Sequence, residues 1–508
     1  MSAPEPSSSE TPSSRTGHDA VIAKLATGIP GVDLVTHGGL PAGRATLVTG
    51  TSGSAKTVFA LQFLAAGAGA GEPGVFVSLE ERPDDIRANA KAIGFDVEAL
   101  EADDRFVFVD ASPATEVESV VAGEYDLGAL LARVEHAVQR VGARRVAVDS
   151  VGALFSQVPH MEVVRRDLFR LVGSLRRLGV TAVLTAERDA EYGASARYGV
   201  EDFVADNVVI LRNVLDDGQR RRSIEVLKLR GTSHQRGEYP FSVIDGEGIV
   251  VLPLTAITSH RRSTDERIST GLPALDALTD GGFFRDSMVL VSGPTGAGKT
   301  LTATHFAAGG LGAGERVLVF SFEETAEQLR RNARGWGVDY ETAEAAGLLK
   351  VFAAFPESAG LEDHLIRMKG LIDTFRPQRI TVDSLSALER GATAKAFREF
   401  VIGLSAYIKQ QEIAGLFTVT TSDLSGGTTI TDSHISTITD AVLLLRYVET
   451  DTEIRRALTV LKMRGSSHNK QVREFVIGSA GMVIGEPFPR IHGFLSSDLT
   501  SSYGGDGG

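Results

Sequence analysis

The chain of 508 residues contains no cysteine, which excludes disulfide bonds and metal sites built on thiolates. It also contains no apolar run long enough to span a bilayer, so we expect no membrane segment. Positive charge is in deficit, because 52 Lys and Arg stand against 65 Asp and Glu and leave a net charge of −13. This balance speaks against a protein that coats nucleic acid with a general basic surface, and we expect no direct nucleic-acid binding.

The remaining composition is that of a folded protein with two tails. A hydrophobic content of 43% and a charged content of 23% are typical of globular proteins with sizeable cores. Residues 1–19 are rich in Ser, Pro, Thr and Glu and lack the apolar core of a signal peptide, so we expect a disordered tail on a cytoplasmic protein. Residues 488–508 thin out into Gly and Ser, which predicts a flexible C-terminal tail.

The chain carries one unit twice. Three motifs recur 243 residues apart, and they are Thr27–Asp33 with Thr270–Asp276, Gly50–Thr57 with Gly293–Thr300, and Ser78–Glu81 with Ser321–Glu324. Two later motifs recur 234 residues apart, and they are Arg145–Ser150 with Arg379–Ser384 and Lys228–His234 with Lys462–His468. The first copy is therefore nine residues longer in between, and we place this insertion near Val117–Tyr125. It is either a tolerated surface insertion or a partner site.

Apolar strand runs alternate with helical patterns in both copies. This predicts an α/β fold with a mostly parallel sheet and helices on both faces. The predicted elements of the first copy include strands at Ala45–Thr49, Val75–Leu79, Phe106–Val109, Arg145–Asp149, Thr181–Thr185 and Val208–Leu211, and helices at Asp84–Ile93 and Leu127–Val141. Hairpins are predicted within Ser223–Leu252 and Ala457–Ile484. The expected organisation is a first domain at 20–254, a polar, basic linker at 255–267 and a second domain at 268–487.

A phosphate-binding loop follows the apolar strand Met288–Val291 and precedes a helical pattern. Its residues are Gly293, Pro294, Thr295, Gly296, Ala297, Gly298, Lys299 and Thr300. The glycines let backbone N–H groups turn inward and cradle phosphate oxygens, and the positive end of the helix dipole faces the anion. Lys299 is placed for the β- and γ-phosphates of ATP and Thr300 for Mg²⁺.

The first copy has the same loop with one informative change. Its residues are Gly50, Thr51, Ser52, Gly53, Ser54, Ala55, Lys56 and Thr57. Ala55 stands where the second copy has Gly298, and an alanine carries a steric cost if this position requires a positive φ. Lys56 and Thr57 remain, so we still expect nucleotide binding there.

Acidic residues follow two further strands of each copy. Asp149 and Asp383 each end an apolar strand before a serine, which is how a Mg²⁺-positioning carboxylate is placed beside a phosphate-binding loop. The pairs Glu80-Glu81 and Glu323-Glu324 follow the second strand of each copy, at the sheet edge where ligands bind. One carboxylate of each pair could orient or deprotonate an attacking water or hydroxyl, although an acidic pair also suits a helix N-terminus.

Two further patterns leave alternatives open. The Lys-x-Arg-Gly-[Thr/Ser]-Ser-His segments at 228–234 and 462–468 are either solvated hairpin faces or cationic fingers offered to a neighbouring subunit's γ-phosphate. In Thr428–Thr439 seven of twelve residues carry hydroxyls. Such a segment near an ATP site could accept a phosphoryl group, but without further information a Thr/Ser-rich edge strand or turn is the better interpretation.

Taken together, these motifs resemble the KaiC family of circadian-clock ATPases and autokinases, which belongs to the RecA-like P-loop superfamily. The similarity extends from about Ala20 to Pro487, and two stretches make it specific, Lys228–Phe241 and Ile430–Asp440. The resemblance implies two tandem RecA-like domains in a double-ring homohexamer, with ATP bound between subunits.

The resemblance also implies roles for single residues. Lys56, Thr57, Lys299 and Thr300 would bind phosphates and Mg²⁺. Glu80 and Glu81 would serve ATP hydrolysis in the first ring, whereas Glu323 and Glu324 would activate the accepting hydroxyl in the second, with Glu323 also helping to hold Mg²⁺. Residues that would reach the neighbouring subunit's nucleotide are Lys228, Arg230, His234, Lys462, Arg464 and His468. Ser436 and Thr437 match the phosphorylated pair, which reverses the interpretation of their segment, and Thr431 matches a regulatory threonine.

The family also suggests partners and competing functions. The nine-residue insertion falls where a KaiB-like protein docks on the first domain. The short, Gly-rich end of the chain departs from the family pattern, which speaks against activation by KaiA and against a self-sustained clock. The expected function is therefore an ATP-dependent serine/threonine autokinase and ATPase of timing or signalling type. The alternatives are a RecA/RadA-like DNA-dependent ATPase and a hexameric scaffold assembled by ATP.

Overall fold

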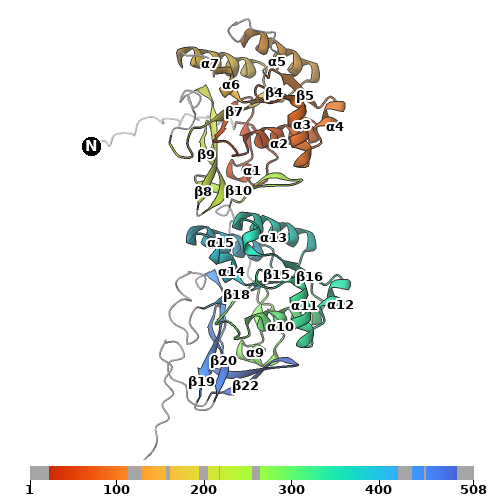
Figure 1. Ribbon diagram of the computed structural model, residues 1–508, viewed down its shortest axis with the longest axis vertical. Coiled ribbons are helices and arrows are strands. Elements are labelled where there is room, and N and C mark those ends of the chain that lie inside the picture. The colour runs from red at the N-terminus through yellow and green to blue at the C-terminus, as the bar shows by residue number, and fades with distance from the viewer. Residues whose placement is uncertain are drawn as a thin grey trace, which may run out of the picture. The chain divides into compact units, whose positions relative to one another are not determined.

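The computed structural model describes residues 22–112, 127–155, 161–193, 204–216, 218–253, 264–421, 438–450 and 453–488. The chain divides into two compact units, residues 1–211 with 225–237 and residues 212–224 with 238–508. Each unit contains one phosphate-binding loop with the strands and helices around it (Figure 1). Within the described residues, no helix is both long enough and apolar enough to cross a membrane.

The first repeat builds a sheet of nine strands in the order β11-β10-β9-β8-β3-β7-β6-β4-β5, and its two short strands β1 and β2 pair with each other in a separate sheet. The strands are β1 (Lys24–Leu25), β2 (Leu40–Pro41), β3 (Ala45–Gly50), β4 (Gly74–Ser78), β5 (Phe106–Asp110), β6 (Arg145–Asp149), β7 (Thr181–Glu187), β8 (Asn207–Asp216), β9 (Gln219–Leu229), β10 (Glu238–Ile244) and β11 (Gly248–Val251). The helices are α1 (Val32–Val35), α2 (Lys56–Gly69), α3 (Pro83–Ala92), α4 (Val97–Ala102), α5 (Leu127–Val141), α6 (Val151–Phe155) and α7 (Met161–Arg177).

The second repeat builds the same nine-stranded sheet, in the order β16-β15-β17-β18-β14-β19-β20-β21-β22, and its short strands β12 and β13 again pair separately. Its strands are β12 (Arg267–Ile268), β13 (Phe283–Phe284), β14 (Met288–Gly293), β15 (Val317–Ser321), β16 (Leu349–Ala353), β17 (Arg379–Asp383), β18 (Ala414–Thr420), β19 (Ala441–Glu449), β20 (Ile454–Met463), β21 (Arg473–Gly478) and β22 (Gly481–Pro487). Its helices are α9 (Pro273–Leu278), α10 (Lys299–Gly312), α11 (Ala326–Gly335), α12 (Tyr340–Ala345), the 3₁₀ helix η1 (Pro356–Ser358), α13 (Leu361–Phe375), α14 (Leu385–Arg390) and α15 (Ala394–Gln410).

The α/β fold predicted from the sequence is confirmed, because the central strands of both sheets are parallel and the C-terminal strands β19–β22 pair antiparallel. Strand β15 is apolar at successive positions because both of its faces are buried. Its alternate residues Leu318 and Phe320 pack into the core under α13–α15, while Val317 and Val319 pack on the other face with residues of α10 and α11. Helices lie on both sides of this sheet (Figure 1), so the strand is buried on both faces.

The parallel register brings the chemically interesting residues to one edge of each sheet. In the second repeat Gly293, where the loop begins, pairs with Thr420, and Ser321, just before the Glu pair, pairs with Asp383. The first repeat pairs Ser78 with Asp149 in the same way. All these residues end parallel strands, and ligands bind at such carboxyl ends.

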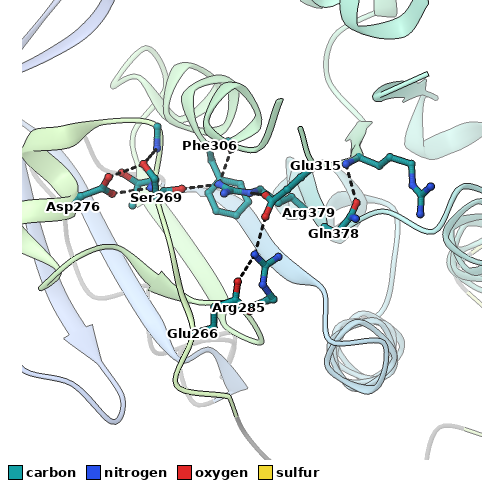
Figure 2. A network of polar contacts seen from close by, with 11 residues as sticks. Glu266, Ser269, Asp276, Arg285, Phe306, Glu315, Gln378 and Arg379 are labelled. Atoms are coloured by element: carbon teal, nitrogen blue, oxygen red, sulfur yellow. Dashed lines mark hydrogen bonds and ion pairs between the residues drawn. The ribbon is translucent and has the colours of Figure 1, made fainter. Parts of the chain in front are cut away.

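A buried guanidinium joins several segments at the opposite edge of the second sheet (Figure 2). The side chain of Arg379 is 2% exposed, and its Nε donates to Glu315. Its Nη1 donates to the carbonyl oxygens of Ser269, at 2.6 Å, and Phe306, at 3.2 Å. Arg285 donates to the second oxygen of Glu315 at 2.9 Å. Each buried charge in this cluster has a partner of opposite sign, so its burial is compensated. The cluster therefore holds β17 against α10 and against Ser269, near the start of the second repeat.

The first repeat contains a simpler version of this cluster. Arg145 donates to Glu72 through Nε at 2.9 Å and through Nη2 at 2.6 Å. Its Nη1 donates to the carbonyl oxygen of Phe63 at 2.9 Å, and its guanidinium lies over the Phe63 ring. The second repeat therefore adds Arg285 and the Ser269 carbonyl to an arrangement that both copies share.

Candidate functional site

Each phosphate-binding loop runs from a central strand into a buried helix, β3 into α2 and β14 into α10. The loop residue just before each lysine adopts the left-handed conformation in both copies, with φ of 71° at Ala55 and 104° at Gly298. The sequence predicted strain at Ala55 if this position required a positive φ, and the structure meets that condition. The helix N-terminus that follows supplies unpaired N–H groups and the positive end of a helix dipole.

Replacing Ala55 with Gly is expected to stabilise the first repeat. A Cβ in the left-handed region costs about 1–2 kcal/mol, and the larger conformational freedom of Gly in the unfolded chain returns about 0.4–1 kcal/mol of that. The net gain in the free energy of unfolding should be about 0.5–1 kcal/mol, measured by denaturant titration with ATP-binding affinity as a second readout.

Gly298→Ala is the matched change in the second repeat and should act in the opposite direction. It places a Cβ at a φ of 104°, within 3.4 Å of Met482 and Phe475. A loss of stability in A55G would show that the strain at Ala55 is not what separates the two loops.

The loop lysines are held by their own loops. Lys299 Nζ donates to the carbonyl oxygen of Pro294 at 3.0 Å, and Lys56 Nζ donates to those of Gly50 and Thr51 at 3.0 and 2.9 Å. Burial lowers the pKa of both ammonium groups from the usual value, against the opposing pull of nearby carboxylates. A phosphate group would offer these ammonium groups a charged acceptor in place of neutral carbonyls.

The strand-ending aspartates lie directly beside the loop threonines, as the sequence predicted from their spacing. Thr57 Oγ1 donates to Asp149 Oδ2 at 2.7 Å, and Thr300 donates a side-chain hydrogen bond to Asp383. Burial raises the pKa of both aspartates, while the hydrogen bonds that their carboxylates accept lower it. A hydroxyl next to a carboxylate is an oxygen ligand set of the kind that Mg²⁺ prefers.

The first glutamate of each pair is tied to the serine after the aspartate. Ser384 Oγ donates to Glu323 Oε1 at 2.8 Å, and Ser150 Oγ donates to Glu80 Oε1 at 2.6 Å. Arg390 adds a cation at 3.9 Å from Glu323. The Glu pair, the aspartate and the loop lysine therefore form one cluster in each repeat.

The second glutamate of each pair is fixed by an asparagine of the following helix. Asn332 Nδ2 donates to Glu324 Oε2 at 2.9 Å, and Asn89 Nδ2 lies 3.5 Å from Glu81 Oε2. Burial, together with the neighbouring aspartate and glutamate, raises the pKa of Glu81 and of Glu324. A carboxylate with a raised pKa is a stronger base, which suits proton abstraction.

The Lys-x-Arg segments lie elsewhere in the chain. Lys228 and Lys462 donate to the carbonyl oxygens of Ala205 and Thr439, each at 2.7 Å. Arg230 lies 3.8 Å from Asp206, and Arg464 lies 3.9 Å from Asp440. His234 and His468 each have one buried ring nitrogen, Nδ1 and Nε2 respectively, without a hydrogen-bond partner among the described residues.

Several predictions concern residues outside the described ranges. They are the acceptor pair Ser436 and Thr437 with Thr431, the insertion near Val117–Tyr125, and the tails at 1–19 and 488–508, of which only Phe488 is described. The predicted linker at 255–267 is described only from Thr264, and its last residue, Arg267, already begins β12. The predicted domain boundaries stay predictions.

Sequence reasoning missed the asparagines and one tyrosine. Asn89 and Asn332 stand 243 residues apart, so the repeat offset could have found them. Tyr447 carries no such signal, since the first repeat has Asn213 at the matching place. Its hydroxyl donates to the carbonyl oxygen of Thr295 at 3.2 Å and so supports the second loop from outside.

Within the described residues no group of three or more His, Asp or Glu side chains could hold a metal ion by itself. Mg²⁺ in nucleotide sites takes one or two protein ligands and completes its shell with phosphate oxygens and water. Thr57 with Asp149, and Thr300 with Asp383, fit that limited requirement.

Comparison with known proteins matches both repeats. A family model described as "ATPase: KaiC" matches residues 25–256 and 268–488. The circadian clock protein KaiC3 of Synechocystis sp. is 58% identical over 475 residues, which cover 94% of this chain and 94% of that protein. The circadian clock oscillator protein KaiC of Synechococcus elongatus is 51% identical over 491 residues, covering 96% and 94%. That of Thermosynechococcus vestitus is 50% identical over 498 residues, covering 98% and 95%.

Proposed function

The chain belongs to the KaiC ATPase family, and from this premise we propose that it is an ATP-dependent serine/threonine autokinase and ATPase that acts in circadian-type timing or related signalling. The observation that carries the proposal is the clustering, in each repeat, of a phosphate-binding loop with a strand-ending aspartate and a pair of glutamates. This is the equipment that phosphoryl transfer requires, since its catalysis is mainly positioning and electrostatic stabilisation.

The loop residues bind and orient the triphosphate. Lys56 and Lys299 neutralise developing charge on the phosphates, and the N–H groups that open α2 and α10 cradle the oxygens. Thr57 with Asp149, and Thr300 with Asp383, would hold Mg²⁺, with Glu323 as a further candidate ligand in the second site. When bound, Mg²⁺ neutralises charge on the β- and γ-phosphate oxygens.

The glutamates supply the base. In the second repeat Glu324 accepts the proton of the attacking hydroxyl, while Glu323, held by Ser384, keeps the local geometry. In the first repeat Glu81 and Glu80 play the same parts toward a water molecule. We assign phosphoryl transfer to the second domain and hydrolysis to the first, because Ser436 and Thr437 have no hydroxyl counterparts in the first repeat.

We further propose a cytoplasmic homohexamer with ATP between subunits. Support comes from the family match over both repeats, because Lys228, Arg230, Lys462 and Arg464 match family residues that reach a neighbouring subunit's nucleotide. Native mass spectrometry with and without ATP tests this assembly. A KaiB-like partner on the first domain is tested by adding a KaiB-like protein and measuring complex formation with and without residues 117–125.

The function is tested with ATP labelled on the γ-phosphate. Purified full-length protein with Mg²⁺ should label itself, and phosphopeptide mapping over a time course should place the label on Ser436 and Thr437. Label only at other residues would overturn the assignment of the acceptors, and ATP hydrolysis without any label would favour the scaffold or a plain ATPase. Hydrolysis that depends on added single-stranded DNA would favour the RecA/RadA-like alternative, against which the net charge of −13 speaks.

A further inference from the structure

A histidine lies behind the second Glu pair in an otherwise apolar core. His364, on α13, is 1% exposed, and its ring meets the ring of Phe322 edge-on, with 5.3 Å between centroids and 82° between planes. Its Nε2 lies 3.1 Å from the carbonyl oxygen of Pro356 in η1. A carbonyl oxygen only accepts hydrogen bonds, so Nε2 carries the proton and Nδ1 presents a lone pair.

The Nδ1 atom of His364 is buried and has no hydrogen-bond partner in the described part of the chain. A buried polar atom without a partner destabilises the fold, because it has given up its hydrogen bonds to water. An apolar side chain of similar size would avoid the cost. The position therefore carries a polar group that packing alone does not favour, and such groups call for a functional explanation.

The first repeat shows that packing alone does not require a histidine here. By the repeat offsets, Leu79 stands in the place of Phe322 and Leu130 in the place of His364. Both leucines are buried, at 2% and 3% exposure, in one apolar cluster. The aromatic pair of phenylalanine and histidine thus belongs to the repeat whose sequence also carries Ser436 and Thr437.

Phe322 connects this histidine to the catalytic carboxylates. It directly precedes Glu323, and its backbone N–H donates to the carbonyl oxygen of Asp383 at 2.7 Å. The turn after it is closed by Ser321 Oγ, which donates to the Glu324 carbonyl at 2.7 Å. Because Phe322 directly precedes Glu323, the packing of its ring bears on the position of the two glutamates that follow.

We propose that His364 is a positioning residue of the second domain's phosphoryl-transfer site, acting through Phe322 on Glu323 and Glu324. The inference rests on the proposed autokinase function and extends it to the residues that set the geometry of the base. A shift of the base by about 1 Å can cost up to about a hundredfold in rate, so a modest repacking at Phe322 is enough to be measured.

The charge state of His364 gives this role a distinctive signature. Burial lowers the pKa of the ring from the usual value; Arg367 also lowers it, whereas the Pro356 carbonyl and Asp363 raise it. The Phe322 side chain, which packs edge-on against the ring, is uncharged. At pH 7 and above the ring is neutral. Protonation in acid would place a charge and an N–H without an acceptor at Nδ1.

The direction of the pH effect follows from proton binding. An unfolded histidine binds its proton near pH 6.5, and the folded one binds it only at lower pH. Between these values the unfolded state holds more protons, so the free energy of unfolding rises with pH and stability is lost as pH falls below about 6.5. The geometry of the Glu pair is expected to suffer over the same range.

Three variants of the full-length protein test the proposal. His364→Leu installs the first-repeat residue, His364→Gln keeps an N–H for the Pro356 carbonyl without a titratable ring, and His305→Gln is the control. His305 is another buried histidine of the second unit, and the first repeat has Gln62 in its place. Initial rates of self-labelling and the KM for ATP are measured from pH 5.5 to 8.5, with first-domain ATP hydrolysis as an internal reference.

We expect H364L to label itself about tenfold more slowly at pH 8 with an unchanged KM, and H364Q to recover most of that rate. Toward acid pH, the rate should fall less steeply in both His364 variants than in the wild-type protein, because neither variant has an imidazole ring at this position that can gain a proton. H305Q should keep the wild-type rate and slope. A wild-type profile in H364L and H364Q overturns the inference. A wild-type protein without any label overturns the proposed function along with it.

Discussion

Glu324→Gln is expected to lower self-labelling of the second domain by about 10²–10⁴-fold, the usual contribution of a general base. Glutamine keeps the size of the side chain and an acceptor oxygen for Asn332, which donates to Glu324 at 2.9 Å in the wild-type protein. The substitution therefore removes proton abstraction with little loss of packing. The measurement is the initial rate of label incorporation at saturating ATP.

The repeat provides the matched control for this substitution. Glu81→Gln changes the equivalent side chain in the first repeat, where Asn89 lies 3.5 Å from the carboxylate. It should lower steady-state ATP hydrolysis while self-labelling continues. Label undiminished in E324Q and in the companion Glu323→Gln would remove the catalytic assignment and favour an ATP-assembled scaffold.

Arg379→Met is expected to destabilise the second unit by about 3 kcal/mol. Removing one partner of a buried ion pair typically costs about 3–5 kcal/mol, because the other charge stays buried. In the variant, Glu315 still has Arg285 as a partner at 2.9 Å, so we expect a loss of stability at the low end of this range. Urea denaturation of the full-length protein, with ATP absent, measures the loss in free energy of unfolding.

A double substitution separates the effect of the unpaired charge from the effect of altered packing. Replacing both residues, as Arg379→Met with Glu315→Leu, should recover most of the lost stability, since a buried ion pair is often no better than apolar side chains of similar volume. Arg145→Met is the corresponding change in the first repeat, where Glu72 is 20% exposed and can be solvated. It should cost less. Equal losses in the two repeats would contradict this reasoning.

The repeat made much of the site predictable from the sequence. Asp149 and Asp383, and the two Glu pairs, were identified because the same residue types recur at fixed offsets, and the parallel strands then bring them to one edge. Strands were located well because buried runs such as Arg145–Asp149 are continuous and bounded. Strand β8 runs on to Asp216, past the predicted Leu211, because its far end pairs with β9 outside the core, where its residues are only partly buried or exposed and the continuous apolar run has ended.

What escaped prediction depends on contacts that no local pattern encodes. Tyr447 meets Thr295 across 152 positions, and nothing in the sequence around either residue announces the contact. The packing of His364 on Phe322 likewise arises only when α13 covers β15. The left-handed backbone at Ala55 could be stated only as a condition, since alanine itself gives no sign of a positive φ.

The Arg379 cluster also has a bearing on the order in which the second unit folds. Its hydrogen bonds to Ser269, Phe306 and Glu315 close loops of 110, 73 and 64 residues. Contacts this distant in sequence are costly to form early, so we expect the cluster to assemble after the rate-limiting step of folding. R379M should then leave the refolding rate nearly unchanged and increase the unfolding rate. Arg379 would therefore contribute to the kinetic stability of the native state rather than to the speed of folding.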